Sequence, residues 1–482
     1  MIEIVSSHVR RCVLASLANQ QEVKLGRVIG LWGGVALVVG GIIGMGIYAL
    51  IAGIAAQAGS ALWLAFILGI LISAIGVLPI IQVAAAIPRA GAGYLYASRL
   101  LNPFWGMLAS YWAVLGGACS TVFVCIGLSC YIAAYWSWGI DGNLQIIILS
   151  LIIPAVFFLL YLFKLRLANW LQIILVAQLV IALVVYGIAG SFQADRPLQF
   201  SLSPSQGFAG LVMATILAYS TCMGFQVIAE MGEEIKNPKR NITLSLIIGG
   251  SVVLILYILV GTVFVSSIPY DFDAIKAMRA PLMDTASLFL PIGVVGFISI
   301  GALTAALTSL NAGFIALPRE LLSQARDELL PASVGKISSR TLTPLRAVGI
   351  YCLLVIGLLL LQFAGFDIDF FAVMAATGIL LMTVLVAVAA TRLPDRYPEQ
   401  YSKAYFKISK PWLVFITILA VITSLSFVIL VLLDYKSTAT VAGIFCALTI
   451  VAVIYYFIRV NYLKKRGVNW SEITHRITGS EE

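Results

Sequence analysis

The chain has 482 residues, of which 61% are hydrophobic and only 11% are charged, and this composition excludes a soluble globular protein. Its net charge of +9 fits basic residues that face an anionic membrane leaflet, so nucleic acid is not needed as a partner. The two histidines, His8 and His475, lie in the polar tails, which argues against a metal-dependent or histidine-based enzyme at membrane depth.

Twelve apolar segments are long enough to cross a bilayer. They span residues 29–56, 61–87, 104–135, 144–163, 168–190, 207–232, 242–266, 286–315, 345–364, 368–391, 411–433 and 439–460. With a cytoplasmic N-terminus, 26 of the 30 Lys and Arg residues fall on the inner side. This bias predicts a multi-pass protein of the plasma membrane with both termini in the cytoplasm. The first 23 residues are polar and mixed, so we expect no cleavable signal peptide.

The first segment contains Gly40, Gly41, Gly44 and Gly46, and interior glycines disfavour a helix by about 1 kcal/mol each relative to alanine. We therefore expect the helix to break between Ile43 and Gly46. Inside a bilayer, an opened backbone is tolerated only where it faces a cavity, an ion or a ligand. The freed amides suit a carboxylate and the freed carbonyls suit an ammonium group or a cation, which together predict an amino acid site. The alternative is that these glycines only allow two helices to pack closely.

The second segment ends in Pro-Arg-Ala-Gly-Ala-Gly-Tyr-Leu-Tyr over residues 88–96, which predicts a turn into a short cytoplasmic element. This stretch resembles the Pro-Arg-Ala-Gly-Gly-x-Tyr-x-Tyr signature of amino acid permeases in the amino acid/polyamine/organocation superfamily. Residues 42–48 are similar to the Ile-Ile-Gly-Ser-Gly-Ile-Phe of that family, whose Gly-x-Gly break binds the substrate carboxylate through backbone amides. The chain departs from these patterns at Ala92 and at Met45, and Met45 predicts a smaller or more apolar pocket.

Small polar residues in the third and sixth segments are the other candidates for the substrate site. Cys119 and Ser120 lie near the middle of the third segment, and Ser220, Cys222 and Gly224 lie where the sixth would break. Each hydroxyl could instead bond back to its own helix. Two interrupted helices five segments apart, with opposite topology, indicate an inverted-repeat transporter with its site at the bilayer midplane.

Several acidic and basic residues follow the second break. Residues 233–240, Glu-Glu-Ile-Lys-Asn-Pro-Lys-Arg, resemble the Glu-Glu-x-Lys-Asn-Pro-x-Arg motif of the family, and we expect Glu233, Glu234 and Arg240 to belong to a cytoplasmic ion-pair gate. Glu230 lies about one turn deeper and is either an intramembrane coupling carboxylate or a local hydrogen-bond acceptor. Several relatives have Glu at the position of Gln226, so proton coupling through that position is in doubt.

The eighth segment carries Thr308, Ser309 and Asn311, and residues 319–331 after it resemble the Arg-x-Leu…Ala-Arg-Asp-Gly-x-Leu-Pro motif of the family, with Glu328 in place of Gly. In sodium-coupled members of the wider leucine-transporter fold, adjacent hydroxyls on this helix ligate sodium. Thr308 and Ser309 are the equivalent pair here, and hydroxyls with freed carbonyls offer the oxygen ligands that a hard cation needs. The fifth segment lacks the lysine that replaces sodium in some proton-coupled relatives.

The resemblance spans residues 25–460 and implies an all-α membrane protein of twelve transmembrane helices with the leucine-transporter 5+5 inverted repeat. We expect a cytoplasmic lead (1–28), two repeats (29–190 and 207–391), two additional helices (411–460) and a cytoplasmic tail (461–482). The predicted function is secondary active transport of an amino acid by alternating access, without a cofactor and without catalysis.

A pocket without Asp or Glu in the first, third and eighth segments favours a neutral amino acid over a polyamine or a cationic amino acid. The coupling ion, sodium or proton, stays open, as do simple exchange and the oligomeric state. A channel would need a selectivity filter or repeated pore-lining rings, and an enzyme would need a constellation of acids, bases or metal ligands. The sequence offers neither.

Overall fold

The computed structural model describes residues 27–136, 138–162, 169–193, 197–222, 224–225, 227–278, 280–338, 341–366, 368–434 and 438–466. The expectations for most of the N-terminal lead, for the end of the C-terminal tail and for Gln226 lie outside these residues. The described chain is all helical, and its only β-type pairings are two isolated bridges, Ile29 with Ile235 and Ala90 with Met231.

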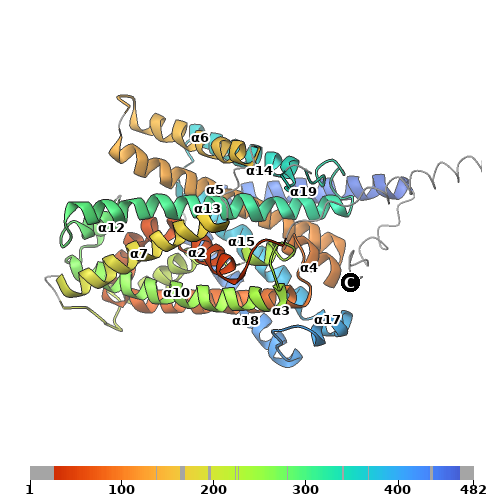
Figure 1. Cartoon of the computed structure of the whole chain (residues 1–482), viewed down its shortest axis with the longest axis horizontal. Helices are drawn as coiled ribbons and strands as arrows, with labels where there is room; N and C mark the ends of the chain where they lie inside the picture. The colour runs from red at the N-terminus through yellow and green to blue at the C-terminus, as the bar shows by residue number, and fades with distance from the viewer. Residues whose placement is uncertain are drawn as a thin grey trace, which may run out of the picture.

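Most helices run along the long axis of the molecule (Figure 1). The long ones are α2 (Leu31–Ala58), α3 (Leu62–Ala86), α5 (Pro103–Tyr135), α6 (Gly142–Leu162), α7 (Asn169–Gln193), α10 (Pro238–Ser267), α13 (Ile292–Arg326), α14 (Leu345–Leu359), α15 (Ile368–Ala390), α18 (Lys410–Asp434) and α19 (Thr438–Lys465). The short ones are η1 (Gly59–Ala61), α4 (Ala92–Leu100), α8 (Gly207–Ser220), α9 (Val227–Glu230), α11 (Phe272–Lys276), α12 (Pro281–Ala286), η2 (Leu360–Ala364), α16 (Leu393–Arg396) and α17 (Pro398–Ser402).

Ten stretches of the described chain are helical, long and apolar enough to cross a membrane, the first of them Leu31–Ala86, which contains α2, η1 and α3. The all-helical membrane architecture is thus confirmed, whereas twelve crossings and a 5+5 repeat stay predictions. The largest difference from the expected bounds is α13, which continues from the apolar stretch into polar sequence as far as Arg326. Hydropathy marks where a helix crosses the membrane, but not where the helix ends.

Two helices are interrupted. Inside α2, Gly44 has φ 33° and ψ −158°, a backbone conformation that side-chain-bearing residues rarely adopt, so the break expected between Ile43 and Gly46 lies at Gly44. The helix α8 ends at Ser220, and four residues of α9 follow from Val227. Turns at Thr221, Cys222, Gly224 and Phe225 separate them.

Close helix packing positions these breaks. α2 is buried over most of its length and lies against α8, α10 and α13, while α5 packs along α15. At the crossing of α5 and α15, a Cβ added to Gly378 would lie 2.8 Å from both Cα of Gly116 and the backbone oxygen of Trp112. Small residues at this crossing let two backbones meet, as membrane helices commonly do.

The edges of the molecule are apolar. α6 and α14 lie together along one edge and α18 along the opposite edge (Figure 1). α18 and α19 expose large apolar side chains, such as Ile422 and Ile454, as expected of helices that face lipid.

Candidate functional site

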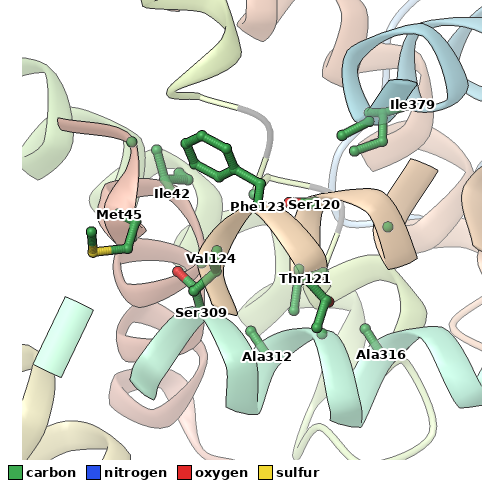
Figure 2. A pocket seen from close by; sticks show the side chains of 18 of the residues that line it. Ile42, Met45, Ser120, Thr121, Phe123, Val124, Ser309, Ala312, Ala316 and Ile379 are labelled. Atoms are coloured by element: carbon green, nitrogen blue, oxygen red, sulfur yellow. The ribbon is translucent and has the colours of Figure 1, made fainter. Parts of the chain in front are cut away.

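A cavity of about 140 Å³ lies between the two interrupted helices and is also lined by α5, α13 and α15. Its polar side chains are Ser120, Thr121, Ser220, Thr221, Glu230 and Ser309, and its larger apolar ones are Ile42, Met45, Leu50, Phe123, Val124, Val227, Leu310, Leu317, Ile379 and Met382. Figure 2 shows Ser309, Ala312 and Ala316 along one face of α13, with Thr121 and Val124 of α5 opposite them.

One wall of the cavity is the break in α2. Gly44, Met45 and Gly46 line it, and they begin the second half of the helix. The first amides of a helix have no partner within the helix and carry partial positive charge, which suits a carboxylate. A Cβ added to Gly44 would lie 2.4 Å from Oγ of Ser309, so the position has no room for a side chain.

The opposite wall is the end of α8, where the last carbonyl groups carry partial negative charge. Ser220, Thr221 and Gly224 line the cavity here. Gly224 also brings the two breaks into direct contact, because a Cβ at this position would lie 2.2 Å from the backbone oxygen of Gly41. The two interrupted helices therefore meet at Gly41 and Gly224.

Side chains from neighbouring helices satisfy the opened carbonyls. The buried hydroxyl of Tyr257 lies 3.3 Å from the oxygen of Ile42 and 3.2 Å from that of Thr221, so one donor serves both breaks. The hydroxyl of Ser73 donates to the oxygen of Cys222 over 3.3 Å. Tyr257 and Ser73 are not predicted from the sequence, because their only local signal is a polar group inside an apolar segment.

The predicted substrate-site residues divide into two groups. Those that line the cavity are Gly44, Met45, Gly46, Ser120, Ser220 and Gly224, while Ile43, Cys119 and Cys222 are buried in the surrounding core and do not line it. Thr121 of α5, the residue after Ser120, also lines the cavity. The hydroxyl of Thr121 lies 2.6 Å from that of Tyr351.

The candidate coupling residues of α13 lie beside the first break. The hydroxyl of Ser309 donates to the carbonyl oxygen of Gly40 over 3.1 Å. The hydroxyl of Thr308 donates to Ala305 of its own helix over 2.9 Å and lies 3.4 Å from the same Gly40 oxygen. Three oxygens thus meet just before Gly44. Asn311 does not line the cavity, and its amide nitrogen donates to Gln172 over 3.0 Å.

Two of the candidate gate residues, Glu233 and Glu234, form ion pairs with α13. Glu233 accepts from both terminal nitrogens of Arg326, over 2.9 Å and 3.2 Å. Glu234, which is 2% exposed, accepts from Nε of the fully buried Arg319 over 2.6 Å. Arg240 is exposed on the first turn of α10.

Electrostatics at this gate favour the charged form of Glu233. Burial acts to raise the pKa of its carboxyl group. The guanidinium of Arg326 and the amide of Ala90 outweigh burial, so the pKa lies below its usual value. Glu233 therefore keeps its negative charge and its ion pair at neutral pH.

Glu230 lies deeper than this pair. Its carboxyl group is 3% exposed, lines the cavity, and accepts from the backbone amide of Ala92 over 2.7 Å. Among the described residues no group of three or more His, Cys, Asp or Glu side chains is arranged to hold a metal ion.

Gly44→Ala tests the first break. A side chain at this backbone conformation costs about 1–3 kcal/mol, and its Cβ would collide with Ser309. We expect the purified protein to fold but to lose stabilisation by amino acids in a thermal-shift assay. Adding Ser309→Ala removes the collision but not the strain, so it should restore binding only in part. Gly357→Ala is the control, because a Cβ there would meet nothing within 4 Å. Unchanged affinity in Gly44→Ala would contradict this site.

Comparison with known proteins identifies the family of this chain. The amino acid permease family profile matches residues 33–472. The chain is 25% identical to the branched-chain amino acid permease BcaP of Bacillus subtilis, over 79% of this chain and 84% of that protein. It is also 25% identical to the methylthioribose transporter of Bacillus subtilis, over 84% and 89%. With the vacuolar cationic amino acid transporter 4 of Arabidopsis thaliana, the identity is 27% over 76% of this chain and 63% of the relative. The chain therefore belongs to the amino acid permease family.

Proposed function

We propose that this permease is a secondary transporter that carries a neutral, apolar amino acid across the membrane by alternating access. The observation that supports it best is the cavity between the two breaks, which has helix-start amides on one wall, a helix carboxyl end on the other, and apolar side chains over the rest. Such a cavity complements both charged groups of an amino acid and an apolar side chain.

Each part of the substrate has a proposed partner. The carboxylate would accept from the amides that begin at Met45 and Gly46, and the ammonium group would donate to the carbonyl end of α8 and to Ser220. The side chain would lie among Val124, Leu310 and Ile379 and their apolar neighbours.

The charge of the cavity favours a neutral substrate. Among its lining residues, Glu230 alone carries an ionisable carboxyl or basic group, and that carboxyl already accepts from Ala92. A second cationic group on the substrate would be buried without a free partner, which is costly. The branched-chain permease among the relatives fits this reading, while the cationic amino acid and methylthioribose transporters define the alternatives.

Two interrupted helices in corresponding places support the finer architecture as well. We assign α2 to α7 to one repeat and α8 to α15 to its inverted counterpart, with α18 and α19 added at the edge. In alternating access, the two repeats would rock around the cavity, and the ion pairs of Glu233 and Glu234 would close the cytoplasmic side.

Counterflow of leucine into proteoliposomes tests the proposed function. We expect saturable uptake that is accelerated by leucine, isoleucine or valine on the other side, and that arginine and spermidine do not inhibit. Tight binding of arginine or spermidine with none of any neutral amino acid would overturn the substrate class. A flux that does not saturate would indicate a channel, and a chemically altered leucine would indicate an enzyme.

Met45→Ala tests which side chain the cavity accepts. Met45 is 1% exposed, lines the cavity and packs beside Gly127 of α5. Removing its thioether should lower the affinity for leucine about tenfold, since one methylene in a pocket changes discrimination by at least that factor, and should improve competition by phenylalanine. Met374→Ala is the matched control, because Met374 is equally buried but does not line the cavity. Equal effects of both variants would contradict the assignment.

The hydroxyls of Thr308 and Ser309 with the carbonyl of Gly40 form a candidate sodium site. If sodium drives transport, leucine affinity should rise with sodium at fixed pH, and Thr308→Val combined with Ser309→Ala should abolish that rise while counterflow continues. Uptake that is indifferent to sodium and to both substitutions would eliminate sodium coupling.

A further inference from the structure

The last helix, α19, is attached to the turn that follows α13. Nε and Nη2 of Arg459 donate to the carbonyl oxygen of Glu328 over 3.1 Å and 3.0 Å, and the hydroxyl of Tyr455 donates to that of Leu329 over 3.0 Å. The side chain of Leu329 is fully buried, in an apolar cluster that also contains Tyr94 of α4. The end of α19 and α4 therefore meet at this turn, at the same end of the molecule (Figure 1).

The turn carries a charged group that holds α4. Glu328 has φ 60°, a left-handed conformation that disfavours residues other than glycine, and the two bonds from Arg459 hold its carbonyl group. The preceding residue, Asp327, forms a buried ion pair with Arg99 of α4. Because Asp327 and Glu328 are adjacent in the chain, the contacts from α19 help to position Asp327 for Arg99.

The same end of α19 is strongly basic. Arg459, Lys464, Lys465 and Arg466 lie within eight residues, and none of them forms an ion pair with another described residue. The guanidinium groups of Arg459 and Arg466 lie 5.2 Å and 4.7 Å from the ring centre of Tyr462. Each is attracted to the ring, but the two positive charges repel each other. An anion bound to both would remove this repulsion.

Apolar and aromatic side chains continue along α19 from its basic end. Ile454, Phe457 and Ile458 are 53%, 55% and 64% exposed. Phe104 of α5 lies beside Phe457, and its neighbour Trp105 is exposed, as aromatic residues at a membrane surface commonly are. A ligand that fits both parts has an anionic head and apolar tails. Basic residues that follow a membrane helix on the cytoplasmic side, where we expect this end, attract anionic lipids.

We propose that an anionic phospholipid binds at the end of α19, with its phosphate on Arg459 and Arg466 and its acyl chains along the apolar face, and that it stabilises the packing of α4. Because Arg459 also holds Glu328, the bound lipid strengthens the contacts that keep Asp327 paired with Arg99. The inference concerns a helix outside the substrate cavity, so it holds whatever substrate the cavity accepts.

Hydrogen exchange tests the inference without a substrate. Protein in phosphatidylcholine nanodiscs is compared with protein in nanodiscs that contain increasing mole fractions of phosphatidylglycerol. Peptides covering residues 92–100 and 327–331 are followed, with peptides of α15 as reference. Protection of both regions should rise with phosphatidylglycerol, and the rise should weaken at high salt, which screens exposed charges.

Two outcomes of this experiment would overturn the inference. One is protection of α4 that is the same with and without phosphatidylglycerol. The other is protection that inorganic phosphate confers in nanodiscs of phosphatidylcholine alone, because the ligand would then be a soluble anion and not a lipid.

Arg466→Gln tests the lipid site without changing the contact with Glu328. The mole fraction of phosphatidylglycerol that gives half-maximal protection should rise about fivefold, the contribution of one basic residue beside an anionic membrane. Lys239→Gln is the matched control, since Lys239 is exposed on the first turn of α10 and is predicted to lie on the same side of the membrane. It should leave this mole fraction unchanged. Equal shifts in both variants would show a general effect of surface charge and refute the site.

Arg459→Lys separates lipid binding from its effect on α4. The variant keeps the positive charge but loses the paired donation to Glu328. We expect it to retain phosphatidylglycerol, measured by native mass spectrometry, while phosphatidylglycerol no longer protects residues 92–100. If α4 of this variant responds to phosphatidylglycerol as the wild-type protein does, the lipid does not act through Arg459 and the proposal fails.

Discussion

A backbone opened inside a membrane must find new hydrogen-bond partners. Gly44 opens α2, and the turns after Ser220 separate α8 from α9. Tyr257 satisfies a carbonyl on each side, and Ser73 satisfies another. The cavity lies between the two breaks, and we propose that the backbone they turn toward it forms the substrate site.

The start of α4 depends on the same chemistry, although this helix begins rather than breaks. The first amides of α4 need acceptors, and Glu230 and Glu320 supply them from α9 and α13. Around them, the buried pair of Arg319 and Glu234 holds α13 to the segment after α9. Removing one partner of such a pair leaves a buried charge, which typically costs about 3–5 kcal/mol. Contacts from distant segments thus hold α4, and any movement of this helix must break several of them together.

The local sequence was sufficient to predict the features that depend on local backbone preference. The glycines of the first segment predicted a break, and the structure has it at Gly44, where φ is positive. Helix bounds followed from hydropathy within a few residues except at α13 and in the sixth segment, where α8 ends at Ser220. These features could be predicted because glycine conformation and apolar length act within one segment.

Features that depend on tertiary contacts could not be predicted. Glu233 and Glu234 lie beside Lys236, Lys239 and Arg240 in sequence, yet their partners are Arg326 and Arg319 of α13. Glu320 follows the apolar part of its segment, and nothing local marked it as buried against α4. Ser120 and Thr121 face the cavity while Cys119 does not, because each residue turns the helix by 100° and only the packing of α5 decides which face is inside.

We propose that the substrate lies between the two breaks, and a cryo-EM structure of the protein with leucine in nanodiscs would locate it. We expect density for the leucine carboxylate at the amides after Gly44, for its ammonium group at the end of α8, and for its side chain beside Val124 and Ile379. Leucine density elsewhere in the molecule, with the cavity between Gly44 and Gly224 left vacant, would contradict it.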